Sequence, residues 1–475
     1  MVKRFLTIII LNLLLAKTLP LEAQTFTTLH NFTNADGQYP IAGLVLASNV
    51  LYGTTSQGGS QSNGTVFAVN TDGSNFRVFH NFTATDPVTG TNLDGAIPAD
   101  GLVLSGNTLF GTAEEGGTNS QYGFGDGTVF SINTDGTNFT VLHTFNGSDG
   151  YQPYARLFLS DGTLYGTAYW GGNIGENAGT IFSINTDGSG FHLIHAFDGN
   201  PQGANPQGGV IMISNVLYGT TAMGGGHSSG AIYSLQTNQV FESLIHPFTG
   251  GSDGDSPRNG LVLSGNTLFG VTPYGGNQSS GTIFSINTDG NDYAVLYNFT
   301  TSNSGTNTDG TLPHSDLIIC GSTLYGTTYS GGNQGNGVVF AMNTINSNYV
   351  VLHSFTETDP DTSANADGAN SESSLVMFNN TLYGTATFGG SQGGGTVFSL
   401  QLPSIAGIIC NSDSSVTINF TGGASTNLVQ VAASLSSPIV WQTISTNTAG
   451  TNGLWQFTDT NASNYSFRFY RSASQ

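Results

Sequence analysis

The stretch Thr108-Leu109-Phe110-Gly111-Thr112 contains a short motif that decides the fold, because that motif recurs in seven copies. The first copy reads Leu51-Tyr52-Gly53-Thr54, and the fifth departs from the pattern as Leu268-Phe269-Gly270-Val271. The leucine of the motif stands at positions 51, 109, 164, 217, 268, 324 and 382, so successive copies lie 51 to 58 residues apart. A fixed period of this length is typical of a repeat protein whose units pack on their neighbours.

Each repeat predicts four short strands, as the second unit illustrates. An apolar run at 101–104 and the motif at 108–112 flank a tight turn, and further strands follow at 127–132 and 139–145. The turn between the last two, Asn133-Thr134-Asp135-Gly136, suits a hairpin because Asp-Gly tolerates the positive φ angles that such turns need. No stretch of the repeat has a helical period with a cap. Four antiparallel strands per repeat predict a β-propeller blade, and a β-helix is the weaker alternative.

The two ends of the repeat region predict how the ring closes. The last unit has its third strand at 395–400 and then leaves the pattern, while a matching fourth strand stands at 26–32. Pairing these two segments closes a circular array and removes an open sheet edge. We therefore predict an all-β protein with a seven-bladed propeller at residues 24–402, closed by its N-terminal strand. Alternating apolar and polar runs predict a small β-sandwich-like module at 405–475.

The four motifs of the unit, in one order over residues 25–400, resemble the GloVer tandem repeat of exported bacterial proteins. The residues that carry the resemblance are Gly43-Leu44-Val45 and its equivalents, the Leu-Tyr-Gly-Thr series, the Gly-Thr-Val-Phe series and the Asn-Thr-Asp-Gly turns. The resemblance implies a secreted, propeller-like protein and brings no catalytic residues with it. Such proteins often end in an anchoring segment, whereas this chain lacks a terminal apolar helix with a basic flank.

The first 23 residues predict a signal peptide. Lys3 and Arg4 precede an apolar run from Phe5 to Ala16, and the segment ends at Leu21-Glu22-Ala23, a small-residue cleavage pattern. An uncleaved anchor is the alternative. We expect export to the cell surface, the extracellular space or the periplasm, with no transmembrane segment in the mature chain.

Composition excludes several classes of function. The formal charge is -21, from 8 Lys+Arg against 29 Asp+Glu, which argues against nucleic-acid binding. Cleavage after Ala23 would remove every lysine, and with them Schiff-base chemistry and a phosphate-loop lysine. Cys320 and Cys410 are too few for a disulfide framework, and we expect buried free thiols rather than a bridge.

Strand order places the long second–third loops and the connections between blades on one face, where binding residues are most often found. Two variable positions precede the Gly-Gly pair of each long loop. Aromatic side chains there suit stacking on sugar rings, although packing against neighbouring blades is the simpler interpretation of any single one. The predicted ligand-binding residues are Tyr169, Trp170, Tyr274, Tyr329, Phe388 and, in the adjacent Gly-rich loop, His227.

Three other sets of residues are weaker candidates for a functional site. Glu114 and Glu115 are adjacent glutamates, and a glycoside-cleaving enzyme needs two carboxyl groups about 5–10 Å apart. Neighbouring residues on one loop usually point apart, so a solvated loop is the simpler interpretation. Aspartates that recur before a glycine between blades are weak candidates for Ca²⁺, and turn formation is the simpler interpretation: Asp36, Asp94, Asp149, Asp253, Asp309 and Asp367. Histidines repeat in the fourth strands and predict packing residues bonded to a neighbouring strand.

The sequence thus predicts a monomeric surface or secreted protein that binds an extracellular polymer, a glycan in the first place, on the long-loop face. A polysaccharide-cleaving hydrolase or lyase on the same face, and a purely structural surface protein, are the alternatives. We expect a binding protein rather than an enzyme, with no cofactor. The sequence does not name the ligand or the mode of surface retention.

Overall fold

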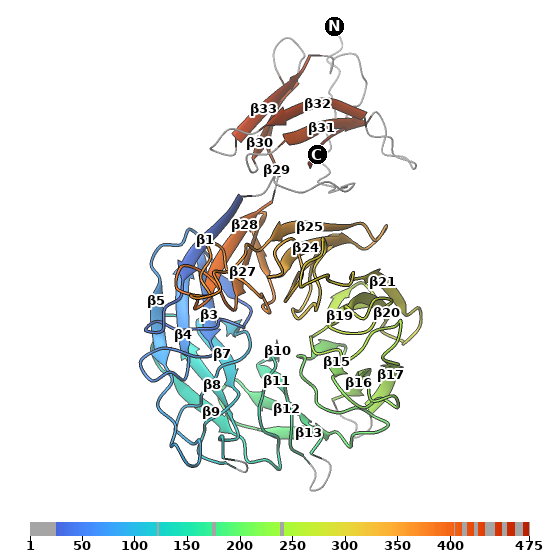
Figure 1. Cartoon of the computed structure of the whole chain (residues 1–475). Coiled ribbons are helices and arrows are strands. Elements are labelled where there is room, and N and C mark those ends of the chain that lie inside the picture. Colours follow the sequence, from blue (N-terminus) through green and yellow to red (C-terminus); the bar gives the residue numbers. More distant parts are fainter. Residues whose placement is uncertain are drawn as a thin grey trace.

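The computed structural model describes residues 25–120, 123–172, 177–237 and 242–402, and further strands between 404 and 474. The predicted signal peptide lies outside the described residues. Seven four-stranded antiparallel sheets succeed one another around a ring (Figure 1). The described residues contain strands and no helix, and among them nothing could cross a membrane as a long apolar helix. The predicted seven-bladed propeller is confirmed.

Blade 2 shows how the repeat folds. Its strands are β6 (Val103–Ser105), β7 (Thr108–Ala113), β8 (Thr128–Asn133) and β9 (Thr140–Thr144), which pair in that order. They agree with the predicted strands to within two residues at each end.

The other blades repeat this order. Blade 1 has β2 (Val45–Ala47), β3 (Val50–Thr55), β4 (Thr65–Asn70) and β5 (Arg77–Asn81). Blade 3 has β10 (Phe158–Ser160), β11 (Thr163–Ala168), β12 (Thr180–Asn185) and β13 (His192–Ala196). Blade 4 has β14 (Ile211–Ile213), β15 (Val216–Thr221), β16 (Ala231–Gln236) and β17 (Glu242–Pro247). Blade 5 has β18 (Val262–Ser264), β19 (Thr267–Thr272), β20 (Thr282–Asn287) and β21 (Ala294–Asn298). Blade 6 has β22 (Ile318–Cys320), β23 (Thr323–Thr328), β24 (Val338–Asn343) and β25 (Tyr349–Ser354).

Blade 7 closes the ring with strands from both ends of the propeller. It combines β26 (Val376–Phe378), β27 (Thr381–Ala386) and β28 (Thr396–Gln401) with the N-terminal β1 (Thr25–Asn31). The antiparallel register runs from Thr25 opposite Gln401 to Asn31 opposite Thr396. Figure 1 shows β1, in blue, and β28, in orange, side by side. The predicted closing strand is therefore confirmed, and it covers the outer edge of β28.

The hydrophobic core is divided among the seven interfaces between neighbouring blades. Each interface holds one cluster of buried side chains from two sheets. In the cluster between blades 1 and 2, Phe82 at the end of one blade packs edge-on against Phe130 of the next at 5.4 Å. The glycine of the recurrent motif is required by this packing. A Cβ at Gly111 would stand 2.7 Å from the Phe130 ring and 2.8 Å from Leu102.

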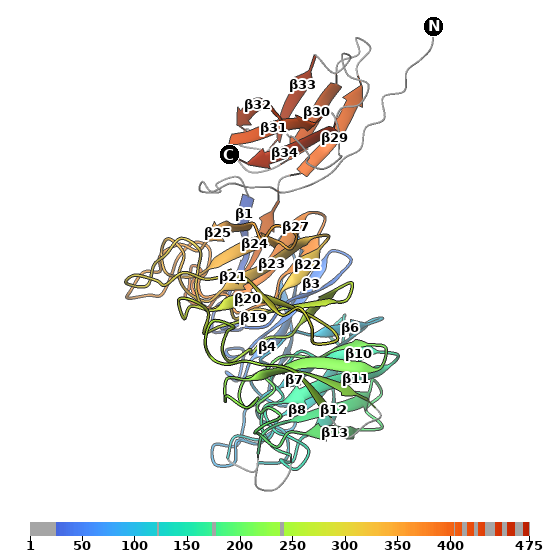
Figure 2. The ribbon, with the colours of Figure 1, turned by 90° about the vertical axis from the view of Figure 1, so that its right-hand side faces the viewer.

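The strands after the propeller form two three-stranded antiparallel sheets, visible beyond the ring in Figure 2. One orders β29 (Ser404–Cys410), β30 (Val416–Thr421) and β33 (Leu454–Asp459), and the other orders β32 (Gln442–Thr448), β31 (Thr426–Ala432) and β34 (Phe469–Ser474). The sandwich-like packing of this module stays a prediction. Cys320 is free and exposed at the end of β22, so the expectation of a buried thiol is wrong there. The side chain of Cys410 lies outside the described residues.

Candidate functional site

The long second–third loops and the connections between blades lie against each other, as the strand order predicts. Short antiparallel bridges join the two segments in every blade: Gln38 to Gln57, Ala96 to Glu115, Tyr151 to Trp170, Ala204 to Met223, Asp255 to Tyr274, Thr311 to Ser330 and Ala369 to Phe388. The two sets of loops therefore share one face of the ring, which we call the long-loop face.

The structure brings two of the predicted aromatic residues into contact with polar side chains of other loops. The guanidinium of Arg258 lies over the ring of Tyr274, 5.4 Å from its centroid. The rings of His314 and Tyr329 are 5.5 Å apart. Both contacts join a long loop to the connection that enters the same blade.

The other predicted ligand-binding residues are more dispersed. Tyr169 and Trp170 are half-buried and touch edge-on at 4.9 Å. Phe388 packs edge-on against Tyr39 at 5.1 Å. His227 is exposed on the long loop of blade 4. Nothing tests their role in binding, so these assignments stay predictions.

The connections between blades continue into the central channel. A cavity of about 60 Å³ lies there, and its lining comes from the residues just before the first strand of every blade: Ile41, Ala99, Asp100, Tyr154, Gln207, Gly208, Arg258, Asn259, His314, Asp316, Glu372 and Ser374. These positions were not predicted as a site.

The threonine of the recurrent motif holds these channel segments in place. In four copies its hydroxyl donates to a carbonyl of the next blade, for example at 2.9 Å from Thr220 to Asn259 and at 3.1 Å from Thr385 to Ala42. In the first copy the Thr54 hydroxyl is buried without a partner among the described residues. The fifth copy carries Val271, which has no hydroxyl to donate. In the following blade the hydroxyl of Ser315 instead accepts the amide of Thr327 at 2.9 Å. The repeat thus fixes the channel backbone and leaves its side chains free to differ between blades.

Two aspartates face the cavity with unusual electrostatics. Asp100 accepts the amide of Arg156 at 2.6 Å, and Asp316 accepts the amide of Gly260 at 2.7 Å. Burial and the neighbouring Asp316 carboxylate raise the pKa of Asp100 to about 7, although nearby amides and the Arg156 guanidinium oppose this shift. Burial also raises the pKa of Asp316. The pair therefore retains protons at a pH where ordinary aspartates are ionised.

Further polar residues of the cavity lining come from blades 5 to 7. The Asn259 amide nitrogen donates to the carbonyl of His314 at 2.6 Å, which orients the Asn259 side chain. His314 Nδ1 lies 3.8 Å from the Glu372 carboxylate. Arg258 projects from the same segment as Asn259. These residues combine donors and acceptors in the lining of one small cavity.

Glu114 and Glu115 are half-buried rather than solvated. Burial, with a contribution from Glu115, raises the pKa of Glu114 to about 7. Burial likewise raises the pKa of Glu115. The field of Glu114 reaches the channel, because Glu114 is among the groups that raise the pKa of Tyr154. The simpler expectation of a solvated loop is wrong, and Glu114 is a protonatable acid beside the channel.

The recurrent histidines and aspartates form pairs that join neighbouring blades. His80 Nε2 lies 2.9 Å from the Asp94 carboxylate, and its ring stacks on Phe139 of the next blade at 3.8 Å. Burial raises the pKa of Asp94, but hydrogen bonds from His80 and Thr83 outweigh it and the net pKa lies below the usual value. Equivalent pairs are His30–Asp36, His143–Asp149, His246–Asp253 and His353–Asp367, with Tyr297–Asp309 in blade 5.

These contacts explain the repeated aspartates without a metal. All six predicted Ca²⁺ candidates accept hydrogen bonds or ion pairs from protein groups. In the described part of the chain, no group of three or more His, Cys, Asp or Glu is arranged to hold a metal ion. Calcium binding therefore stays a prediction with no described site to carry it.

The channel residues were not predicted, because they differ from blade to blade and the shared motifs do not include them. A signal was present in the Gly43 position, which is also glycine at 101, 209 and 260 but is Arg156, Asp316 or Ser374 elsewhere. This position is glycine in four blades and charged in two. Packing between blades does not require such a difference, so the charged residues there point to another role.

Together these observations define a seven-bladed β-propeller of tandem repeats, with a polar channel opening among long loops. Residues 17–123, 88–265 and 242–454 match the family described as the Gloeobacter/Verrucomicrobia repeat. The chain belongs to this family, which confirms the resemblance seen in the sequence.

Several solved structures are similar in part. An oligogalacturonate lyase from Vibrio parahaemolyticus is 10% identical, with 80% of this chain and 94% of that chain covered and a TM-score of 0.49. A putative 6-phosphogluconolactonase from Bacteroides uniformis is 12% identical, with 86% and 98% covered and a TM-score of 0.44. A chain of a nidogen/laminin complex is 14% identical, with 64% and 93% covered and a TM-score of 0.38. Comparison with curated proteins gives no match. The function has to be argued from the site itself.

Proposed function

We propose that the protein is exported and, as a monomer at the cell surface or outside the cell, binds a glycan on the long-loop face. The observation that carries this proposal is the contact between predicted aromatic residues and channel-lining polar groups. Tyr274 lies against Arg258, and Tyr329 lies against His314. The long loops and the channel mouth thus form one continuous surface.

Such a surface suits sugars for two physical reasons. The C–H face of a pyranose ring packs on an aromatic ring, while the hydroxyl groups need nearby donors and acceptors. Half-buried Tyr169 and Trp170 offer aromatic area, and the channel wall offers donors and acceptors. A purely apolar surface would leave the sugar hydroxyls without hydrogen bonds, and a purely charged surface would offer no aromatic ring for the C–H face.

The charge of the chain narrows the glycan class. With a formal charge of -21, the protein repels polyanions at moderate ionic strength. A neutral polysaccharide meets no such barrier. We therefore propose a neutral glycan as the ligand.

Affinity electrophoresis tests this proposal. Purified mature protein is run through gels that contain β-glucan, mannan, xylan or starch, and retardation by at least one polymer is expected. Trp170→Ala and Tyr274→Ala should each reduce that retardation at least fivefold, because each removes aromatic area on the long-loop face. Ile345→Ala is the matched control, since Ile345 is an 82% exposed apolar residue in a tight turn between third and fourth strands. Equal retardation of all four proteins would refute the long-loop face as the binding surface.

A second candidate, cleavage of the bound polysaccharide, is favoured by one observation. Burial and Glu115 raise the pKa of Glu114 to about 7, so this carboxyl group holds a proton near neutral pH and is able to donate it to a leaving group. The four polysaccharides used in the gels are incubated with the protein, and the mixtures are assayed for new reducing ends. New reducing ends that appear with the wild type and not with Glu114→Gln would establish polysaccharide cleavage. No new reducing ends with the wild type would refute cleavage of these polymers.

A further inference from the structure

Three residues that line the channel cavity each have a buried polar atom without a hydrogen-bond partner among the described residues. These atoms are Arg258 Nε, Asn259 Oδ1 and His314 Nε2. All three residues line the same cavity. A buried polar atom without a hydrogen bond costs about 1–3 kcal/mol, so three around one small cavity call for a common explanation.

The chemistry of these atoms is well defined. Arg258 Nε carries a hydrogen and only donates. Asn259 Oδ1 only accepts, because its amide nitrogen is already fixed by donation to the His314 carbonyl at 2.6 Å. His314 Nε2 either donates or accepts, according to its tautomer. A pair of hydroxyl groups satisfies all three, since each hydroxyl both donates and accepts.

Charge around the cavity disfavours an ionic ligand of either sign. An anion would approach the Glu372 carboxylate, whereas a cation would approach Arg258 and the nearby guanidinium of Arg156. Burial raises the pKa of Asp100 and of Asp316, so these two groups carry less negative charge than ordinary aspartates. A neutral group that carries several hydroxyls avoids both conflicts.

The ring restricts how such a group enters. The blades surround the axis completely, because β1 pairs with β28 and leaves no gap between the first and last blades. The cavity is about 60 Å³, while one water needs about 10–15 Å³ on this measure. That volume accommodates a few hydroxyl groups at the tip of a chain.

We propose that the channel is a subsite for the terminal sugar of a neutral glycan, held by Arg258, Asn259 and His314, so that the protein recognises chain ends. This inference rests on the proposed function and adds the mode of recognition. The aromatic residues of the long loops then contact the units that follow the terminal one.

Calorimetric titration tests the mode of recognition. The probes are tetrasaccharides of β-1,4-glucan, β-1,3-glucan, β-1,4-mannan and β-1,4-xylan, together with their parent polymers. For the glycan that binds, the tetrasaccharide should be at least tenfold more potent than the polymer per unit mass, because it presents far more ends. Arg258→Gln and His314→Gln should each weaken tetrasaccharide binding at least tenfold, while Ile345→Ala binds as the wild type does. Thermal unfolding within a few degrees of the wild type establishes that both channel variants are folded.

The remaining outcomes separate this inference from the proposed function. If the polymer is as potent per unit mass, and both channel variants bind normally while Trp170→Ala does not, the long-loop face binds glycan but chain-end recognition is overturned. If only uronic-acid or amino-sugar tetrasaccharides, added as further probes, bind the wild type, the neutral terminal sugar is overturned. If no oligosaccharide or polymer binds the wild type, both proposals fall.

Discussion

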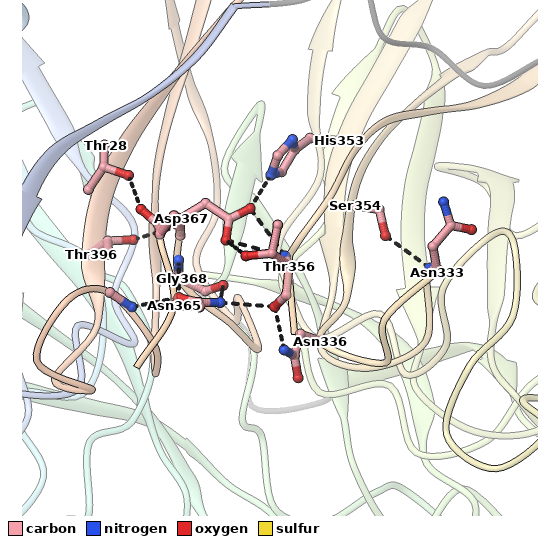
Figure 3. A network of polar contacts seen from close by, with 12 residues as sticks. Thr28, Asn333, Asn336, His353, Ser354, Thr356, Asn365, Asp367, Gly368 and Thr396 are labelled. Atoms are coloured by element: carbon pink, nitrogen blue, oxygen red, sulfur yellow. Dashed lines mark hydrogen bonds and ion pairs between the residues drawn. The ribbon is translucent and has the colours of Figure 1, made fainter. Parts of the chain in front are cut away.

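Replacement of Asp367 by alanine tests how the blades are joined. The Asp367 carboxylate accepts His353 Nε2 at 2.7 Å and the Thr356 amide at 3.2 Å, and it also accepts the Thr356 hydroxyl. Figure 3 shows these bonds beside the one from Thr396 to the Asp367 carbonyl. Asp367 is only 5% exposed, so water does not replace the lost acceptor easily. The substitution therefore leaves three donors without their partner.

The magnitude follows from these contacts. A hydrogen bond to a charged group contributes about 1.5–3 kcal/mol, but Thr356 lies near solvent and recovers part of its share from water. We expect Asp367→Ala to lower the free energy of unfolding by about 2–4 kcal/mol. Asp367→Asn keeps one acceptor oxygen and should cost about half as much.

Urea unfolding at pH 7 measures the change, and hydrogen exchange of the Thr356 amide locates it. Asp361→Ala is the matched control, because Asp361 is an exposed residue of the same connection and its carboxylate accepts no hydrogen bond within the described residues. A free energy of unfolding for Asp367→Ala within 0.5 kcal/mol of the control would refute the structural role assigned to the His–Asp pairs.

Three further predictions concern packing, charge and ring closure. Gly111→Ala should destabilise the protein by about 1–3 kcal/mol in urea unfolding, since the new methyl group meets the Phe130 ring; an unchanged midpoint would contradict the packing. Because the pKa of Glu114 is raised to about 7, its ionisation opposes folding above the unfolded-state pKa of 4.5 and reaches full effect above pH 7. Glu114→Gln should therefore stabilise the protein by about 1–2 kcal/mol at pH 8 and by almost nothing at pH 4, and equal effects at both would contradict the shift. Removal of β1 (Thr25–Asn31) exposes the edge of β28 and should produce aggregation on size-exclusion chromatography, whereas a soluble monomer would contradict closure by this strand.

The strands and turns of the repeat were predictable from the sequence because similar residues recur at the same place in successive repeats. The Leu-Tyr-Gly-Thr motif predicted the second strand of each blade. The segment at 26–32 matches the fourth strand of the other repeats, and it predicted how the ring closes. The recurrent histidines were predicted to pack against neighbouring strands, and His80 does so on Phe139. In each case one physical requirement repeats, so that seven examples support one inference.

The channel site could not be predicted in the same way. Arg258, His314 and Asp316 belong to blades 5 and 6, whereas Asp100 belongs to blade 2, more than 150 residues away. They meet only because the ring closes around one axis. Each departs singly from the repeat. A charged residue at a repeat position that is mostly glycine, as at Asp316, marks a difference between blades but does not say which residues meet. The raised pKa of Glu114 likewise depends on burial that its local sequence does not encode.

Hydrogen exchange in the presence of a saturating neutral glycan tests the central claim most directly, because it locates the ligand without any substitution. We predict slower exchange in the channel segments 256–261 and 312–317 and in the long loops around Trp170 and Tyr274. The tight turns at 105–108 and 133–137, on the opposite face, should be unchanged. Protection confined to those turns or to the strands after residue 403 would contradict a binding site on the long-loop face.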